Sequence, residues 1–275
     1  MINNLNEVVA QFKQLWTAQL DDQAIAAICR QAGMSWRQTV LTPIVTIKVF
    51  FLQILHGNTA CAGLRHLARL AFSGAAYCDA RMRIPLSVFQ SLLEQTATRM
   101  KEAISESPRW RGHRLFYVDG SGFSMPDKPA LQKAFGQPTG QKPGGGFPVA
   151  HFLLLMHAAT GTSLRHLKIT MKMDVLKCMT VDGVLKELAI FVLIYNLVRL
   201  VMVEASRLEK VEVERISFID ALRWLVNARP GDRLCHLVVN PQRPNRYEPR
   251  VKKRRPKAYP LMTRPRKELK KDLAA

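Results

Sequence analysis

The stretch HRLFYVDGSGFSM, residues 113–125, decides the fold class, because a mostly helical pattern gives way there to a strand pattern. Its apolar run Leu115–Val118 contains aromatic and β-branched residues, and Asp119-Gly120 follows at once. That order predicts a β-strand that closes in a turn. The segment GFPVAHFLLLMHAATG, residues 146–161, predicts a second strand. We therefore expect an α/β fold.

Between the two predicted strands lies GQPTGQKPGGG, residues 136–146. A phosphate-binding loop would end in Gly-Lys-Ser/Thr and lead into a helix, whereas this loop lacks that ending and leads into a strand. We interpret it as a flexible connector.

Residues 1–108 predict a helical N-terminal domain. Three helices in it are each expected to begin at a Thr or Ser that can cap the first turn. Their expected bounds are Thr42–Leu55, Thr59–Ala71 and Ser87–Ile104. Short helices joined by tight turns are also the pattern of a helix-turn-helix DNA reader, so plain packing and DNA reading both stay open.

Residues 163–240 predict basic and apolar closing helices. Thr180 is an N-cap signal for a long helix that reaches about Leu208. Its most apolar run, Leu188–Val203, is shorter than the roughly 20 residues of a membrane span, and it contains Arg199. We therefore expect a buried core helix and no membrane partner.

Residues 241–275 form a strongly basic tail, with thirteen Lys and Arg residues against three acids. Several prolines interrupt the tail, so we expect it to be disordered. Non-specific phosphate binding and a sequence-reading role both stay open for it.

The whole chain of 275 residues has 41 Lys and Arg against 21 Asp and Glu, a formal net charge of +20. Nucleic acid is favoured as the polyanionic partner over a membrane surface, because counterion release drives its binding. The N-terminus has no secretory signal pattern, and the five cysteines form no Cys-x-x-Cys pair, so we expect a reduced, cytoplasmic protein. His56, Cys61 and His66 match no structural zinc spacing, which favours core packing for them.

Three segments resemble a known family: residues 54–93 (ILHGNTACAGLRHLARLAFSGAAYCDARMRIPLSVFQSLL), residues 113–161, and residues 164–188 (LRHLKITMKMDVLKCMTVDGVLKEL). They are similar to DDE transposases of bacterial insertion sequences, of the insertion-sequence-four type, over most of the chain. The resemblance implies that residues 109–162 are the opening strands of a ribonuclease H-like catalytic domain. It also implies cut-and-paste DNA transposition, with double-stranded DNA and transposon ends as partners.

In that family the Asp of Asp-Gly-Ser/Thr is the first metal-binding carboxylate, and it corresponds to Asp119. Two Asp and one Glu hold two metal ions, of which one activates the attacking water or 3′-hydroxyl and the other stabilises the leaving oxygen. The resemblance thus implies Asp119 as a catalytic and metal-binding residue, and Mg as the cofactor.

The other two carboxylates are missing from this sequence. The family's Glu lies seven residues before a Lys that corresponds to Lys168, and Gly161 stands at that position. No Asp or Glu occurs from Lys128 to Met173, as though an internal block had been removed. Asp127 and Asp174 remain as substitutes, and Asp174 is expected to begin a helix.

Three hypotheses follow. The first is an internally deleted transposase relative, with an incomplete ribonuclease H-like core, that binds DNA without cutting it. The second is an active metal-dependent nuclease or transposase with a substitute carboxylate. The third is an incompletely folded pseudogene product, because missing strands leave sheet edges unpaired. A homodimer stays open. The expected DNA-binding residues are Arg165, Lys168, Lys172, Arg250, Lys252, Lys253, Arg254 and Arg255.

Overall fold

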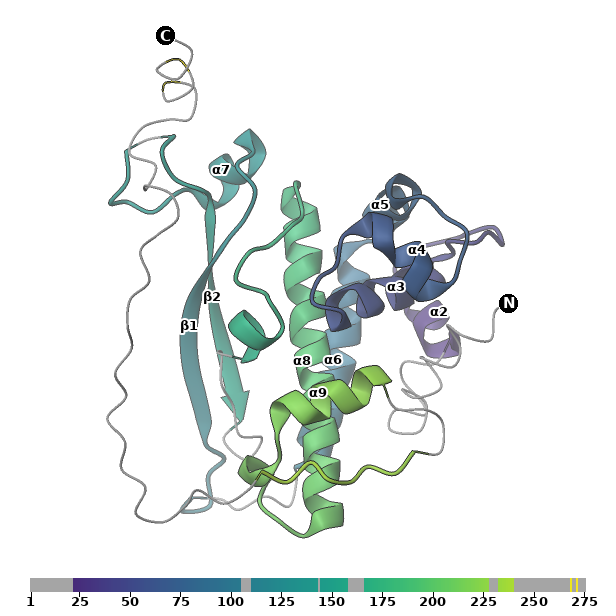
Figure 1. The fold of residues 1–275 in the computed structure, drawn as a ribbon, viewed down its shortest axis with the longest axis vertical. Coiled ribbons are helices and arrows are strands. Elements are labelled where there is room, and N and C mark those ends of the chain that lie inside the picture. The colour runs from purple at the N-terminus through teal and green to yellow at the C-terminus, as the bar shows by residue number, and fades with distance from the viewer. Residues whose placement is uncertain are drawn as a thin grey trace.

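The computed structural model describes residues 22–104, 110–142, 144–157, 166–227 and 232–239, together with Glu268 and Lys271. These residues form a mixed fold of helices and one small antiparallel sheet. Figure 1 shows the long helix α8 running through the middle of the molecule, with helices α2 to α6 on one side of it and the two strands on the other. The α/β class predicted from the sequence is confirmed in this coarse form.

The elements of the described residues alternate between helices, single turns of helix and two strands. In chain order they are α2 (Asp22–Gln31), α3 (Pro43–Leu55), the 3-10 turn η1 (Cys61–Gly63), α4 (Leu64–Ala68), α5 (Gly74–Arg83), α6 (Leu86–Ala103), β1 (Phe116–Ser124), α7 (Pro129–Phe135), β2 (Val149–His157), the π-helical turn η3 (His166–Thr170), α8 (Val181–Glu209), the 3-10 turn η4 (Val213–Arg215) and α9 (Phe218–Asn227).

Helix α8 forms the centre of the core. Thr180 is its N-cap, as predicted, and Oγ1 of Thr180 accepts a hydrogen bond from Gly183 N at 3.1 Å. Among the described residues, α8 is the helix that is long and apolar enough to cross a membrane, and 78% of its most apolar window is buried inside the protein. That burial is the environment of a core helix. The apolar residues at helical spacing along α8 form a stripe that is buried throughout: Val184, Leu188, Phe191, Tyr195, Val198 and Met202.

Two other predicted helices are confirmed. Oγ1 of Thr42 accepts a hydrogen bond from Val45 N at 3.3 Å and so caps α3, which ends at Leu55 as expected. Helix α6 matches the helix expected over Ser87–Ile104 within one residue at each end. The expected cap is wrong, because Pro85 is the N-cap and Ser87 lies inside the helix. All but the first few residues of α3 are buried, so this helix packs in the core and presents no long face to a DNA groove.

The helix expected over Thr59–Ala71 is wrong at both ends. It ends at Ala68, because Arg69 has a left-handed backbone with φ at 51°. Gly57 and Asn58 have positive φ angles of 69° and 53°, which reverse the chain after α3. Thr59 N donates to Gln53 O at 3.2 Å, and Thr59 O accepts from Gln53 Nε2 at 3.0 Å. These bonds hold Thr59 in the reversing turn, so the helical residues begin only at η1 and α4.

Strands β1 and β2 pair antiparallel along their full lengths, from Phe116 opposite His157 to Ser124 opposite Val149. Each strand has nine residues. The second predicted strand is therefore confirmed as β2, and the loop between the strands leads into it as expected.

The predicted Asp-Gly turn is wrong, because β1 continues straight through Asp119 and Gly120. Side-chain alternation continues to Phe123, which is fully buried and packs edge-on against Phe152 with 6.0 Å between ring centroids. Because a strand keeps one set of alternate residues on the buried face, burial of Phe123 fixes the register and favours continued pairing over a turn.

The two faces of the sheet differ in burial. On the face toward the helices, Met156 is buried. On the opposite face Val118, Leu153 and Leu155 are 67%, 78% and 65% exposed. Leu153 leans over Gly120, where a Cβ would lie 3.1 Å from Leu153 Cδ2. The face toward the helices is therefore packed in part, since Tyr117 on that face is 56% exposed, and the opposite face is apolar and exposed.

The segment before α8 is less helical than predicted. Between His166 and Thr170 the chain makes a single π-helical turn, and Asp174, expected to begin a helix, lies in a turn instead. Asp174 O accepts from Ser124 N at 3.3 Å, and Leu176 N donates to Ser124 O at 2.8 Å. This short pairing with the end of β1 occupies the backbone groups that a helix would have needed.

Candidate metal and nucleic-acid site

Asp119 lies in the middle of β1, opposite Leu154 of β2. Its side chain is exposed, and Oδ1 accepts a hydrogen bond from the next backbone amide, Gly120 N, at 2.8 Å. Because side chains alternate along a strand, Asp119 shares the helix-facing side of the sheet with Phe123. An exposed carboxylate can contribute to binding of a hard cation such as Mg²⁺, which requires further oxygen ligands.

The two candidate substitute carboxylates do not complete such a ligand set. Asp127 Oδ1 accepts a hydrogen bond from Gln132 Nε2 of α7 at 3.0 Å. Asp174 lies in the turn beside the last residue of β1. Among the described residues, no group of three or more His, Cys, Asp or Glu side chains could hold a metal ion.

Lys168, expected to contact DNA, is used within the fold. Its Nζ donates to Ser121 Oγ at 3.2 Å and to Gly122 O at 3.1 Å, and it lies 5.7 Å from the centroid of the Phe123 ring. These contacts tie the π-helical turn η3 to β1. Lys168 is half-buried, so only part of its side chain is open to a phosphate.

Lys172 is exposed and has a left-handed backbone, with φ at 59°. Its side chain lies over Gly57, where a Cβ would be 3.3 Å from Lys172 Cδ. Of the expected DNA-binding residues that the structure describes, Lys172 is thus the more accessible. The other expected DNA-binding residues lie outside the described part of the chain: Arg165, Arg250, Lys252, Lys253, Arg254 and Arg255.

Cys61 lies beside Cys78, with 3.6 Å between the two Sγ atoms. His66, which was considered with Cys61 as a possible zinc ligand, accepts a hydrogen bond at Nε2 from Arg65 Nε at 3.1 Å. Burial, and then the neighbouring Cys78 thiol, raise the pKa of the Cys61 thiol. A raised pKa disfavours the thiolate, which is the form that binds metals.

Sequence reasoning missed Glu187, a buried carboxylate on α8. Oε1 accepts from Asn58 Nδ2 at 2.7 Å and from Lys177 N at 3.0 Å, and Oε2 accepts from Cys178 N at 2.9 Å. Burial, followed by the charge of Glu187, raises the pKa of the Cys178 thiol. Glu187 therefore joins the turn after α3 to the segment before α8. Its signal in the sequence is an acid next to Leu188 within an apolar stripe.

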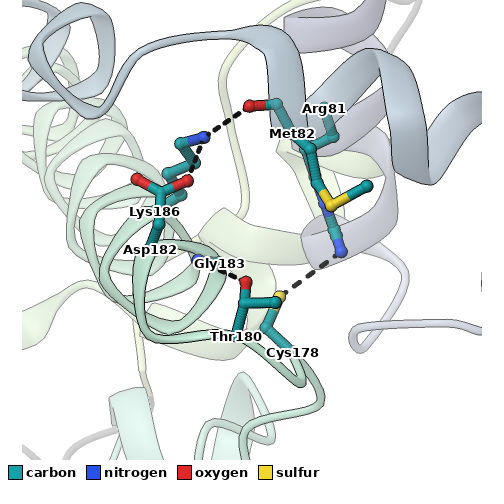
Figure 2. A network of polar contacts seen from close by, with 7 residues as sticks. All are labelled: Arg81, Met82, Cys178, Thr180, Asp182, Gly183 and Lys186. Atoms are coloured by element: carbon teal, nitrogen blue, oxygen red, sulfur yellow. Dashed lines mark hydrogen bonds and ion pairs between the residues drawn. The ribbon is translucent and has the colours of Figure 1, made fainter. Parts of the chain in front are cut away.

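A second polar network joins α5 to the start of α8, as Figure 2 shows. Lys186 pairs with Asp182 and donates from Nζ to Met82 O at 3.0 Å. Arg81 Nη2 donates to Cys178 Sγ at 3.3 Å. The cations of this network are engaged within the protein and hold the two helices side by side.

Arg199 is the other charged residue whose place the sequence did not indicate. In the sequence, Arg199 is a charge that disfavours a membrane-spanning helix. In the structure it is buried, with 4% of its surface exposed, in the middle of the core helix α8. A charge on the buried face of a helix needs a partner or a ligand, and this is the signal that could have drawn attention to it.

Over 97 residues the chain is 33% identical to a curated protein of Escherichia coli (strain K12) named "Putative transposase InsZ". The match supports a transposase-related protein. It covers 35% of this chain, and the chain spans 31% of that transposase's length. No protein-family model matches the chain, and no solved structure matches it.

Proposed function

We propose that the chain is a DNA-binding relative of insertion-sequence transposases that has lost the chemistry of strand cleavage. The similarity to a transposase supports a DNA partner, and the net charge of +20 supports a polyanion. Double-stranded DNA, with transposon ends as its specific sites, satisfies both observations. The cytoplasm, where such DNA lies, is the location that this proposal implies.

The proposed loss of activity rests on how few metal-binding side chains lie around Asp119 among the described residues. Two-metal catalysis needs several carboxylates around the ion pair. The described residues contain no group of three metal-binding side chains, and the sequence from Lys128 to Met173 contains no acid at all. One exposed carboxylate is too few ligands for two Mg²⁺ ions, so in this proposal Mg is a cofactor of intact relatives and not of this chain.

An internal deletion would account for the form of the sheet. Among the described strands, β1 and β2 pair only with each other, and Val118, Leu153 and Leu155 are exposed on the outer face. In a larger sheet with helices on both faces, such residues are covered. We interpret the two strands as the opening of a ribonuclease H-like core of the insertion-sequence-four type whose other strands are missing. The uncovered face would also suit a second copy of the chain, and sedimentation velocity tests that homodimer.

The basic tail is the part of the chain that we expect to supply most of the DNA affinity. Lys168 is already bonded to β1, so the proposal assigns the DNA contacts to Lys172, Arg165, Arg250 and the run Lys252–Arg255. Phosphate contacts from such residues release counterions and make binding strongly dependent on salt.

The experiment is fluorescence anisotropy of labelled duplex DNA at several salt concentrations. It compares the full chain with a variant in which Lys252, Lys253, Arg254 and Arg255 are alanine. A matched control removes the same charge from exposed positions of the helices and their connecting turns: Arg37, Arg83, Lys210 and Arg223.

The tail variant should bind DNA more weakly, and the slope of log affinity against log salt should fall by about 3 to 4, because four phosphate contacts are lost. The control should keep most of the affinity. An equal loss of DNA affinity in both variants would mean that net charge alone determines binding, and would contradict a DNA-binding tail. No DNA binding by the full chain would overturn the proposed function.

A further inference from the structure

Arg199 is a buried cation with unused hydrogen-bonding capacity. Its Nη1 donates to Met202 Sδ at 3.1 Å, while Nε and Nη2 have no hydrogen-bond partner among the described residues. Burial lowers the pKa of Arg199, and the charges of Tyr195 and Glu214 oppose that shift. A buried guanidinium without a hydrogen-bonded anion is costly in free energy, so its presence in a core helix suggests a ligand that binds there.

A pocket of about 530 Å³ lies between α6, α8 and the sheet, and Arg199 is one of its lining residues. Much of its lining is apolar, including Met100 of α6, Phe116 of β1 and Leu154 of β2. Arg199 lines the pocket together with Lys101, which is exposed, and the half-buried Arg114. The described lining residues thus include three cations, Arg199, Lys101 and Arg114, and no Asp or Glu.

We propose that this pocket binds a small organic anion whose apolar body packs against Met100, Phe116 and Leu154 and whose carboxylate or phosphate group pairs with Arg199. Nε and Nη2 form one edge of the planar guanidinium, and that edge matches two oxygens of a carboxylate or phosphate. The volume falls within the range of small-molecule sites, about 300–1,000 Å³, and the mixture of apolar walls with a few polar groups is typical of them.

The site is distinct from the proposed DNA contacts. Arg199 is 4% exposed and its Nε and Nη2 atoms are buried, so a phosphate of a rigid duplex cannot reach it. In the proposal a small anion enters the pocket that Arg199 lines, and the edge of the guanidinium turns toward it. Lys101 and Arg114 lie along the same pocket and would attract the anion toward it. Anion binding in this pocket therefore does not depend on whether the chain binds DNA.

Isothermal titration tests the site with two anionic probes, octanoate as the carboxylate and phenyl phosphate as the phosphate, and with octan-1-ol as the uncharged match. The proteins are the full wild-type chain, Arg199→Met and the control Arg223→Met, in which an exposed arginine of α9 is removed. We expect saturable binding of at least one anion to the wild type and to the control, and none of the alcohol. Affinity for Arg199→Met should fall by about tenfold or more, as expected for loss of a charge-assisted pair.

The two probes distinguish a carboxylate ligand from a phosphate ligand. Tighter binding of octanoate indicates a carboxylate ligand, and tighter binding of phenyl phosphate indicates a phosphate ligand. Absence of binding by both anions, or equal affinity in the wild type and Arg199→Met, would overturn the proposal. Without anion, Arg199→Met should melt at a higher temperature than the wild type, because an unpaired buried charge has been removed.

A second pair of variants leaves Arg199 in place. Ala97 lines the pocket and is exposed, so Ala97→Trp should block the mouth and abolish binding of the anion. Thr98, the next residue of α6, is exposed and does not line the pocket, so Thr98→Trp should bind as the wild type does. Unchanged binding in Ala97→Trp would show that the anion lies elsewhere and would contradict the proposal.

Discussion

The helical body, made of α2 to α6 with α8 and α9, and the two-stranded sheet of β1 and β2 bury their apolar residues to different extents. In α8, Phe191 and Leu193 are fully buried. In the sheet, Met156 is covered by the helices, while Leu153 on the opposite face is 78% exposed. The helical body has a continuous buried core, whereas the sheet has apolar side chains that are exposed on its outer face.

The difference indicates where the stability of the protein originates. An isolated two-stranded ribbon is at best marginally stable in water, so the sheet depends on its packed face. Phe123, fully buried in β1, belongs to the same continuous core as Ile25 of α2 and Phe191 of α8. We therefore expect the helical body to dominate the free energy of unfolding, and the sheet to unfold together with it.

The comparison predicts its largest effect for truncation of apolar side chains. Phe191→Ala should lower the free energy of unfolding by about 4 kcal/mol, because it opens a cavity in the closed core. Leu153→Ala should change it by less than about 0.5 kcal/mol, because that side chain is already in water. Urea unfolding of both variants measures the two values. Similar losses would show that a partner or an unseen segment covers the outer face of the sheet.

Loss of the Glu187 carboxylate should be nearly as costly. Glu187→Ala leaves Asn58 Nδ2 and the amides of Lys177 and Cys178 without their acceptor in a buried site, and should destabilise by about 3 kcal/mol. The control is Glu204→Ala on the same helix, where the pair with Arg207 is exposed at 3.7 Å and contributes less than about 0.5 kcal/mol. Equal effects of the two variants would contradict a structural role for Glu187.

Much of the helical body could be predicted from the sequence, because its signals are local. Thr42 and Thr180 cap the helices that they predict, and the apolar stripe of α8 is buried as its spacing indicates. The sheet was harder to predict from the sequence, because its register depends on residues that are far apart in the chain. Asp119-Gly120 has the local pattern of a turn, but pairing with β2 and burial of Phe123 keep it extended.

The residues of the candidate site also differ in how well the sequence alone indicates them. Asp119 is a candidate from the residues around it and stays a prediction, whereas the buried positions of Glu187 and Arg199 could not be predicted from their neighbours in the sequence. Asn58, which donates to Glu187, is 129 residues away in the chain. The residues that line the pocket beside Arg199 come from α6, α8 and both strands. A charged residue in an apolar stripe can be noticed in a sequence, but its partners become visible only when the fold brings them together.

A smaller effect is expected where the sheet is tied to the rest of the chain. Lys168→Ala removes the bonds to Ser121 Oγ and Gly122 O and should destabilise by about 1.5 kcal/mol. Lys172→Ala, four residues away and exposed, should leave the free energy of unfolding nearly unchanged but weaken DNA binding. Thermal unfolding and DNA anisotropy measure the two effects. Destabilisation by Lys172→Ala, with unchanged stability and weaker DNA binding in Lys168→Ala, would contradict these roles.

The smallest effect concerns the first turn of α8. Gly→Ala in a helix usually stabilises by up to about 1 kcal/mol, but a Cβ at Gly183 would lie 2.8 Å from Thr180 Oγ1 and 3.1 Å from Cys178 Cβ. The Thr180 cap would have to move, at a cost of about 1 kcal/mol, so Gly183→Ala should give no gain or a small loss. Gly63→Ala has open space and should stabilise by about 0.5 kcal/mol. A clear gain for Gly183→Ala in urea unfolding would show that this cap is not fixed.

The central claim, a DNA-binding chain without a working metal site, is tested most directly by titrating Mg²⁺ and Mn²⁺ into the full chain and into Asp119→Ala, followed by a DNA-nicking assay on the same samples. We expect cooperative unfolding of both proteins, no saturable heat of metal binding and no nicking by either. Metal binding and nicking by the wild type that Asp119→Ala abolishes would mean that other carboxylates complete the site, and would contradict the account.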